Sequence, residues 1–267
     1  MQSILKHGFG LKASRSFFEK LSPSVVKGMI KDKGFILVND MNYTRESFAD
    51  MASKYGNLIK FAQETRPGMK SNQVLDLDGN SERLVSGRVE LPLHSDGNIL
   101  KTNVDLVFLY ADEIKNLKYQ GGTTIVDFKK ALEQMPPHLK RILDEEQFET
   151  LGIEKGYYPE GVEPYWFQME TYNDRGWTKQ FNIYLNYKEK SQGISWITRL
   201  RGFSESENER FFFELDKYFR KYEHSYLHYW KKGDLIIMDN RRVLHARQSF
   251  DKGSTRLIFR IQLSEPI

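Results

Sequence analysis

The chain has 267 residues, enough for one large domain or two small ones, and its content of 39% hydrophobic and 13% aromatic residues excludes a disordered chain. It contains no cysteine, which excludes disulfides, thiolate metal sites and a cysteine nucleophile. The net charge is +4, the N-terminus lacks the apolar region of a signal peptide, and no apolar run reaches the roughly 18 residues of a membrane span, so we expect a cytoplasmic protein.

The N-terminal part of the chain predicts a scaffold of helix, strand and helix. Apolar residues at helical spacing predict a helix over 13–31, broken into two pieces at Pro23. The apolar run 34–38 has the length of a strand. Residues 44–54 predict a second helix, with Thr44 as its N-cap.

The next part mixes short strands with helices. Residues 76–80 are acidic and predict a hairpin turn, because the oxygen-ligand spacing of a calcium loop is absent. Residues 104–110 predict a buried strand, and 121–127 predict a turn that enters a strand. One helix is expected from Phe128, and another over 138–149 after a pair of prolines.

The region from 151 to 228 predicts a long loop, a strand and a helix. Residues 151–180 lack periodicity, and loops of such length often cover a site. Residues 181–187 alternate with period two, which predicts a strand, and 204–223 predict a helix with a Ser-x-x-Glu capping box. His224 and His228 resemble half of a helical zinc site, but the motif lacks the glutamate that would lie between them.

The C-terminal part predicts two strands, over 235–238 and 254–263. In the last strand Arg256 and Arg260 lie on one face, because alternate residues of a strand point the same way. Two buried arginines are costly unless an anion binds them, whereas at the edge of a sheet the same face would be solvated.

His94 and Asp96 are candidate metal ligands. On an extended strand their spacing places both side chains on one face, where they could hold one metal ion. A distant histidine, His245, would complete the two-histidine, one-carboxylate set of non-haem Fe(II) oxygenases. The alternative is an ordinary surface or core role for His94, since so short a motif also occurs by chance.

Four motifs, in this order, resemble those of the taurine/2,4-D dioxygenase-like branch of the Fe(II)/2-oxoglutarate-dependent oxygenases. They are His94-x-Asp96-Gly97, Gly121-Gly122-Thr123-Thr124, the segment 239–247 around His245, and Arg256. The resemblance extends from about residue 34 to the C-terminus. One departure is Ala246, because the residue after this histidine is usually glycine in the family.

The resemblance implies an α+β fold, a double-stranded β-helix (jelly roll) core with flanking helices, formed by residues 1–267 as one domain. It also implies that His94, Asp96 and His245 hold Fe(II). Relatives that halogenate have a small residue in place of this carboxylate, so Asp96 favours hydroxylation or desaturation of a small molecule by O2, with decarboxylation of 2-oxoglutarate to succinate.

In the same family pattern Thr124 and Arg256 bind 2-oxoglutarate, and Arg260 would bind 2-oxoglutarate or an acidic substrate. Loops determine the substrate in this branch, here 60–90 and 151–180. Part of the sequence also resembles the oxygenases paired with isonitrile synthases, so we expect an amino-acid-derived substrate from secondary metabolism.

Two other functions are compatible with parts of this sequence. The first is a non-catalytic jelly-roll protein that binds a small molecule, although such a protein would have little need of the complete ligand set. The second is a nucleic-acid-demethylating oxygenase, but acidic and basic residues are interspersed and no basic groove is indicated. We therefore expect no nucleic-acid or membrane partner.

Overall fold

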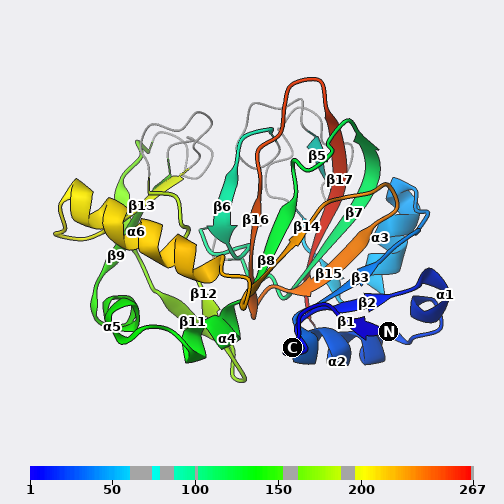
Figure 1. Ribbon diagram of the computed structural model, residues 1–267, viewed down its shortest axis with the longest axis horizontal. Helices are drawn as coiled ribbons and strands as arrows, with labels where there is room; N and C mark the ends of the chain where they lie inside the picture. The colour runs from blue at the N-terminus through cyan, green and yellow to red at the C-terminus, as the bar shows by residue number, and fades with distance from the viewer. Residues whose placement is uncertain (61–73, 79–86, 100–101, 153–161, 188–195, 266–267) are drawn as a thin grey trace.

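The computed structural model describes residues 1–267 apart from 61–73, 79–86, 100–101, 153–161, 188–195 and 266–267. Its centre consists of two sheets that face each other (Figure 1). The strands of the larger sheet are β1 (Gln2–Ser3), β2 (Leu11–Ala13), β3 (Phe35–Val38), β4 (Asn57–Leu58), β5 (Leu75–Asp78), β7 (Leu106–Lys115), β15 (Leu235–Asp239) and β17 (Thr255–Ser264). Those of the smaller sheet are β6 (Leu91–His94), β8 (Thr123–Asp127), β14 (Ser225–His228) and β16 (Val243–Arg247).

The strand orders place β17 and β16 inside their sheets. The larger sheet runs β1-β2-β3-β15-β7-β17-β4, with β5 also paired to β17, and the smaller runs β14-β8-β16-β6. Neighbouring strands are antiparallel except for the parallel pair of β2 and β3.

The remaining elements flank these sheets. A three-stranded sheet contains β9 (Phe148–Gly152), β10 (Trp166–Met169) and β13 (Trp196–Leu200), and a hairpin contains β11 (Tyr172–Asp174) and β12 (Lys179–Phe181). The helices are α1 (Arg15–Phe18), α2 (Pro23–Lys33), α3 (Arg45–Ser53), α4 (Phe128–Glu133), α5 (Pro137–Glu145) and α6 (Glu205–Phe219). No helix in the described ranges is long and apolar enough to cross a membrane.

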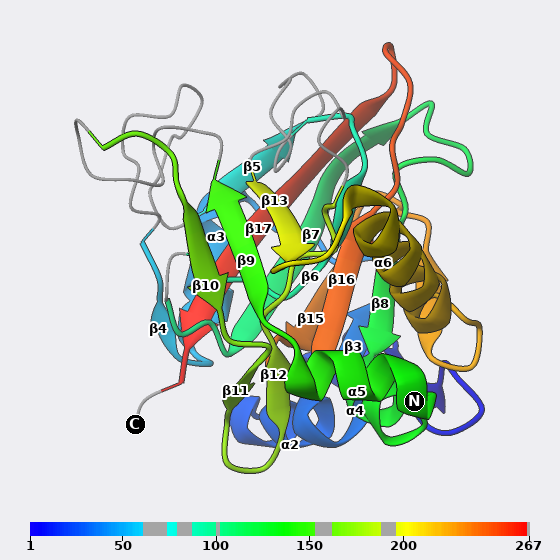
Figure 2. The same cartoon turned by 90° about the vertical axis from the view of Figure 1, so that its left-hand side faces the viewer.

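Buried apolar side chains form an inner core between the sheets and an outer core on each side. Ile125 of β8 and Val243 of β16 meet Met238 of β15 in the inner core. Helices α2 and α3 cover the outer face of the larger sheet, and α4, α5 and α6 cover that of the smaller sheet (Figure 2). Both faces of each sheet are covered, so a polar side chain that points inward is removed from water. Its burial costs free energy unless a ligand or another polar group binds it.

Several predicted elements are confirmed. The helix over 13–31 is divided into α1 and α2, and Ser22 caps α2 directly before Pro23. Thr44 caps α3, and the predicted capping box begins α6. The predicted strands at 34–38, 121–127, 235–238 and 254–263 correspond to β3, β8, β15 and β17.

Other predicted elements were wrong. Residues 76–78 are not in a turn but in β5, where they pair with β17, while the rest of that motif, 79–80, lies outside the described residues. Helix α5 ends at Glu145 and is followed by β9, because Phe148 is needed in the outer core. Residues 182–186 are buried and Tyr187 is partly buried, but they form no strand, since isolated bonds such as Leu185 N–H to Leu93 O (3.1 Å) replace a regular ladder.

Candidate metal and co-substrate site

The two predicted histidine ligands are direct neighbours on adjacent strands. His94 is the last residue of β6, His245 is the central residue of β16, and the pairing register sets one opposite the other. Their ring centroids are 4.3 Å apart. Together with Asp96 they form a buried cluster in which the possible ligand atoms all lie within 4.8 Å of one another. The structure therefore brings together all three predicted metal ligands.

A backbone bond orients the His94 ring. Its Nδ1 lies 2.7 Å from the carbonyl oxygen of Pro92, and since a carbonyl only accepts, Nδ1 carries the hydrogen. In the neutral ring the Nε2 atom then keeps its lone pair, and it lies 3.4 Å from Oδ1 of Asp96. A hydrogen bond on the far nitrogen is the usual means of orienting a metal-binding imidazole.

Asp96 reaches the site from a turn, not from the strand on which we predicted it, because β6 ends at His94. The turn requires glycine at position 97, where φ is +93° and a Cβ would lie 2.2 Å from the Thr102 carbonyl oxygen. The side chain of Asn240 fixes the Asp96 backbone, since its Oδ1 accepts from Asp96 N–H (2.8 Å) and its Nδ2 donates to Asp96 O (3.0 Å).

The charge of the site is set by burial and by Arg260. Burial opposes ionisation of Asp96, but the Arg260 guanidinium, 3.3 and 3.4 Å from the two carboxylate oxygens, holds the pKa of that carboxyl well below its usual range. Burial and the neighbouring His94 lower the pKa of His245 to about 3. An ionised carboxylate and a neutral imidazole are the forms that bind a metal.

Arg256 lies near the start of β17, on the face between the two sheets, and its side chain is buried. Its Nε donates to Gly121 O (2.9 Å) and its Nη2 to the hydroxyl of Thr123 (3.3 Å), which also accepts from Nε1 of Trp230 (2.9 Å). Burial lowers the pKa of the guanidinium well below its ordinary value. Such a group gains from an anionic partner, as predicted, and the solvated-edge alternative is excluded because β17 is paired on both sides.

Thr124 does not lie where the sequence motif predicted. Residues that pair across antiparallel strands point to the same face. Thr124 pairs with Ala246, which belongs to the outer core, whereas Thr123 pairs with Arg247 on the inner face. The threonine that contacts Arg256 is therefore Thr123, because successive side chains of β8 alternate between the two faces.

Sequence reasoning missed two residues of the site, Asn240 and Arg247. Asn240 belongs to the turn before His245, and only the folded chain shows that its amide holds Asp96. Arg247 is 4% exposed and lies on the same face of β16 as His245. Its position two residues after the distal histidine could have indicated this, because β16 is a strand.

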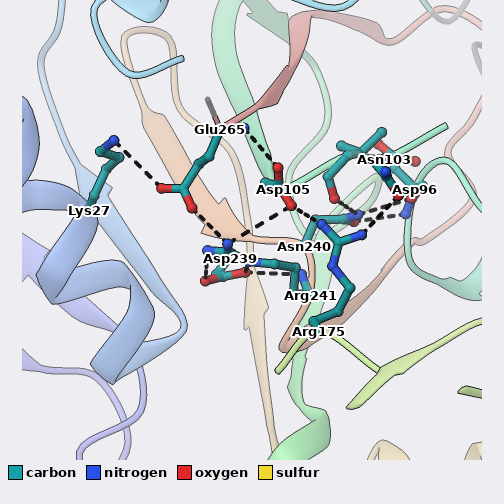
Figure 3. A network of polar contacts seen from close by, with 10 residues as sticks. Lys27, Asp96, Asn103, Asp105, Arg175, Asp239, Asn240, Arg241 and Glu265 are labelled. Carbon is teal, nitrogen blue, oxygen red and sulfur yellow. Dashed lines mark hydrogen bonds and ion pairs between the residues drawn. The ribbon is translucent and has the colours of Figure 1, made fainter. Parts of the chain in front are cut away.

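A chain of ion pairs supports the turn that carries Asn240 (Figure 3). The Arg241 guanidinium forms two hydrogen bonds with Asp239 (2.8 and 2.7 Å) and one with Glu265 (2.7 Å). Asp105 accepts from Arg175 and from the backbone of Glu265, and its own carbonyl accepts from Asn240 N–H (2.9 Å). The turn that carries Asn240 is thus tied to the C-terminal segment and to the β11–β12 hairpin.

His224 and His228 form no helical pair. His228 ends β14 and its Nε2 lies 3.1 Å from Asp234, while His224 precedes that strand and packs against Tyr218. His138, on α5, is exposed and pairs with Glu214.

The donor set fits a divalent iron ion. Two imidazoles and one carboxylate converge from two strands and a turn, and Nδ1 of His245 has no hydrogen-bond partner within the described residues. Two histidines and one carboxylate define the class of mononuclear non-haem Fe(II) oxygenases.

Residues 4–262 match the family model described as taurine catabolism dioxygenase TauD, TfdA family. The chain belongs to this family and is a 2-oxoglutarate-dependent dioxygenase, an oxidoreductase that uses iron and 2-oxoglutarate.

Solved structures share the fold. AAD-2 in complex with Mn(II) and N-oxalylglycine is 16% identical, with a TM-score of 0.70 over 99% of this chain and 98% of that one. PvcB from Pseudomonas aeruginosa is 18% identical, with a TM-score of 0.67 over 97% and 88% of the two chains. A taurine dioxygenase from Burkholderia xenovorans is 16% identical, with a TM-score of 0.62 over 93% and 84%.

Proposed function

We propose that the chain, as a single domain with a double-stranded β-helix core, hydroxylates or desaturates an amino-acid-derived small molecule. His94, Asp96 and His245 would hold Fe(II), which together with 2-oxoglutarate and O2 supplies the oxidising power for a C–H bond while 2-oxoglutarate is decarboxylated to succinate. The observation that carries this proposal is the buried two-histidine, one-carboxylate cluster.

The 2-oxoglutarate site would lie at Arg256. The guanidinium would bind the carboxylate far from the metal, through charge-assisted hydrogen bonds. Thr123, which already accepts from Arg256 and Trp230, would set the direction of the guanidinium and turn its own hydroxyl toward the ligand. Arg260 would keep Asp96 ionised and in place, while remaining within reach of an anion.

The proposed substrate class rests on similarity to other oxygenases. PvcB, with which this chain shares its fold, is described as an Fe, α-ketoglutarate dependent oxygenase from an isonitrile synthetic pathway. Residues 93–97 and 104–110 together resemble the oxygenases paired with isonitrile synthases, and most of the second segment belongs to the buried strand β7. Of the two loops expected to select the substrate, 60–90 and 151–180, residues 61–73, 79–86 and 153–161 lie outside the described residues, and the second loop also contains β10, β11 and part of β12.

The test of the proposed function is a spectrum taken without oxygen. The apoprotein, loaded with Fe(II) and 2-oxoglutarate, is expected to show a weak visible charge-transfer band that is absent from His245→Ala. His138→Ala, which removes an exposed histidine, should retain the band. A folded wild-type protein that binds iron but shows no band would contradict the assignment of the three metal ligands together with the co-substrate.

A further inference from the structure

A buried imidazole that is not part of the metal site lies beside the proposed 2-oxoglutarate residues. His228 ends β14 and is 5% exposed. It pairs with Thr123 of β8, and since residues that pair across antiparallel strands point to the same face, both side chains lie between the two sheets. Thr123 in turn contacts Arg256. The fold therefore places His228 next to the threonine that orients the guanidinium.

The carboxylate that faces His228 is itself firmly held. Asp234 is buried, its Oδ1 accepts from Nδ2 of Asn39 (2.6 Å), and its Oδ2 accepts from Lys231 N–H (2.8 Å). Burial opposes ionisation of this carboxyl, but hydrogen bonds from His228, Asn39 and the backbone hold its pKa below the ordinary value. An ionised carboxylate in a fixed position therefore faces the imidazole.

Hydrogen bonds at both ring nitrogens orient His228. Its Nε2 lies 3.1 Å from Oδ2 of Asp234, and since a carboxylate only accepts, Nε2 carries a hydrogen. In the neutral ring Nδ1 then accepts from the hydroxyl of Tyr226 (3.3 Å). The plane of the imidazole is therefore determined by two partners that lie on opposite sides of the ring.

The oriented imidazole packs against the indole of Trp230. The two rings form a T-shaped pair, with centroids 4.8 Å apart and planes at 85°. Nε1 of the indole donates to the hydroxyl of Thr123 (2.9 Å), and the guanidinium carbon of Arg256 lies 5.9 Å from the ring centroid. The indole thus contacts His228 on one side and both proposed co-substrate residues on the other.

The direction of the Thr123 hydroxyl depends on this indole. A hydroxyl has two acceptor sites and one donor hydrogen. Trp230 and Arg256 donate to the two acceptor sites, which leaves the hydrogen of Thr123 to be donated to a ligand. If the indole moved, the hydroxyl would be free to turn, and the guanidinium would lose a fixed partner.

We propose that His228 is a positioning residue for 2-oxoglutarate, because it holds Trp230 and through it the arrangement of Thr123 and Arg256. This deepens the proposed function and rests on it. Asp234 and Tyr226 contribute by fixing the imidazole. Since the contacts end at Arg256, the effect of His228 is confined to the carboxylate far from the metal.

The test compares two 2-oxo acids, 2-oxoglutarate and 2-oxobutanoate, which lacks the far carboxylate. Each is titrated into the anaerobic Fe(II) protein while the visible band is recorded, a readout that does not depend on turnover. The wild type should bind 2-oxoglutarate at least about tenfold more tightly, as hydrogen bonds to a charged group predict. His228→Gln removes the ring but keeps an amide that can donate to Asp234. It should raise the dissociation constant of 2-oxoglutarate about tenfold and leave that of 2-oxobutanoate unchanged.

Further variants identify the route through the indole. Trp230→Phe keeps an aromatic ring but removes the donor to Thr123, so it should weaken 2-oxoglutarate binding to a similar extent. In the double variant with His228→Gln the combined effect should be smaller than the product of the two single effects, because both act on one chain of contacts. His224→Gln, at a buried histidine that packs against Tyr218, is the matched control and should leave both dissociation constants unchanged.

The outcomes separate this inference from the proposed function. Equal weakening of both acids in His228→Gln would show a general structural role and overturn the inference, and so would unchanged affinity for both. A double variant whose effect equals the product of the single effects would show that His228 does not act through Trp230. Unchanged binding in Trp230→Phe overturns the route even if His228→Gln does not fold. Absence of the band in the wild type instead contradicts the proposed function itself.

Discussion

At the scale of single residues, the pairing register of β8 decides which threonine contacts Arg256, the residue proposed to bind 2-oxoglutarate. Thr123→Val removes the hydroxyl that accepts from Arg256 and Trp230 but keeps the shape of the side chain. We expect a rise of about tenfold in the dissociation constant of 2-oxoglutarate, as loss of roughly one hydrogen bond predicts. Thr124→Val changes a residue of the opposite face and should leave this constant unchanged. Titration of the visible band measures both variants, and the reverse pattern would restore Thr124.

Asn240 positions Asp96, the proposed metal ligand. Asn240→Ala leaves one buried N–H and two carbonyl oxygens, those of Asp96 and Val104, without their partner. Loss of such supporting bonds typically costs about 10- to 100-fold in metal affinity. We expect a fall of that size in Fe(II) affinity, measured by calorimetry. Asn173→Ala, at an exposed position of β11, should not change it. Unchanged iron affinity in a folded Asn240→Ala protein would show that the turn holds Asp96 unaided.

The ligands could be predicted from the sequence, but much of their support could not. His94 and Asp96 occupy one short pattern and His245 a second, distant one, and the chemistry of both depends on residue type and spacing. Asn240 and Thr123 act through contacts made across strands, and a strand's register depends on packing on both its faces. A shift of one residue exchanges the two faces, which is why the motif indicated Thr124 and the fold selects Thr123.

At the scale of elements, helices with caps were predicted well and irregular segments were not. Local signals suffice for α2 and α6, whose caps are neighbours in sequence. Residues 182–187 alternate like a strand, but their bonding partners lie at 93, 171 and 198 and do not form one ladder. Their alternation therefore reflects burial between other elements, which a period-two pattern cannot distinguish from pairing.

We expect the junction of α6 and β14 to lose stability as the pH falls, because of His224. His224 is buried beside Tyr218 of α6, and its carbonyl accepts from Asp127 at the end of β8. Burial lowers the pKa of this histidine, so the unfolded chain takes up a proton more readily than the folded one. Its contribution to stability is complete above the unfolded pKa of roughly 6.5 and is lost as the pH falls below that value. Urea unfolding of the wild type should therefore lose more free energy on acidification than that of His224→Gln. Parallel pH curves would show that this histidine does not titrate differently on folding.

At the scale of the whole molecule, one ion-pair chain joins parts of the sequence that are far apart. Arg241 and Asp239 flank Asn240, and Glu265 extends the chain to Lys27 of α2 at 3.6 Å (Figure 3). Because Asp239 is fully buried, Arg241→Met should leave an uncompensated charge and reduce the free energy of unfolding by about 3–5 kcal/mol. Arg199→Met, which breaks the exposed pair with Glu149, should cost no more than about 1 kcal/mol.

A double variant distinguishes the net contribution of this ion pair to the free energy of unfolding from the cost of leaving one of its charges unpaired. Asp239→Asn/Arg241→Met removes both charges, so urea unfolding should show a smaller loss than the sum of the two single variants. Burial raises the pKa of Asp239, which is the expected sign for a carboxylate that depends on its partner to stay ionised. If the double variant is more stable than the single variants but binds Fe(II) more weakly than the wild type, the ion pair acts mainly by holding Asn240 against Asp96. If iron affinity returns with stability, the turn needs only neutrality, and the amide of Asn240 alone positions the metal ligand.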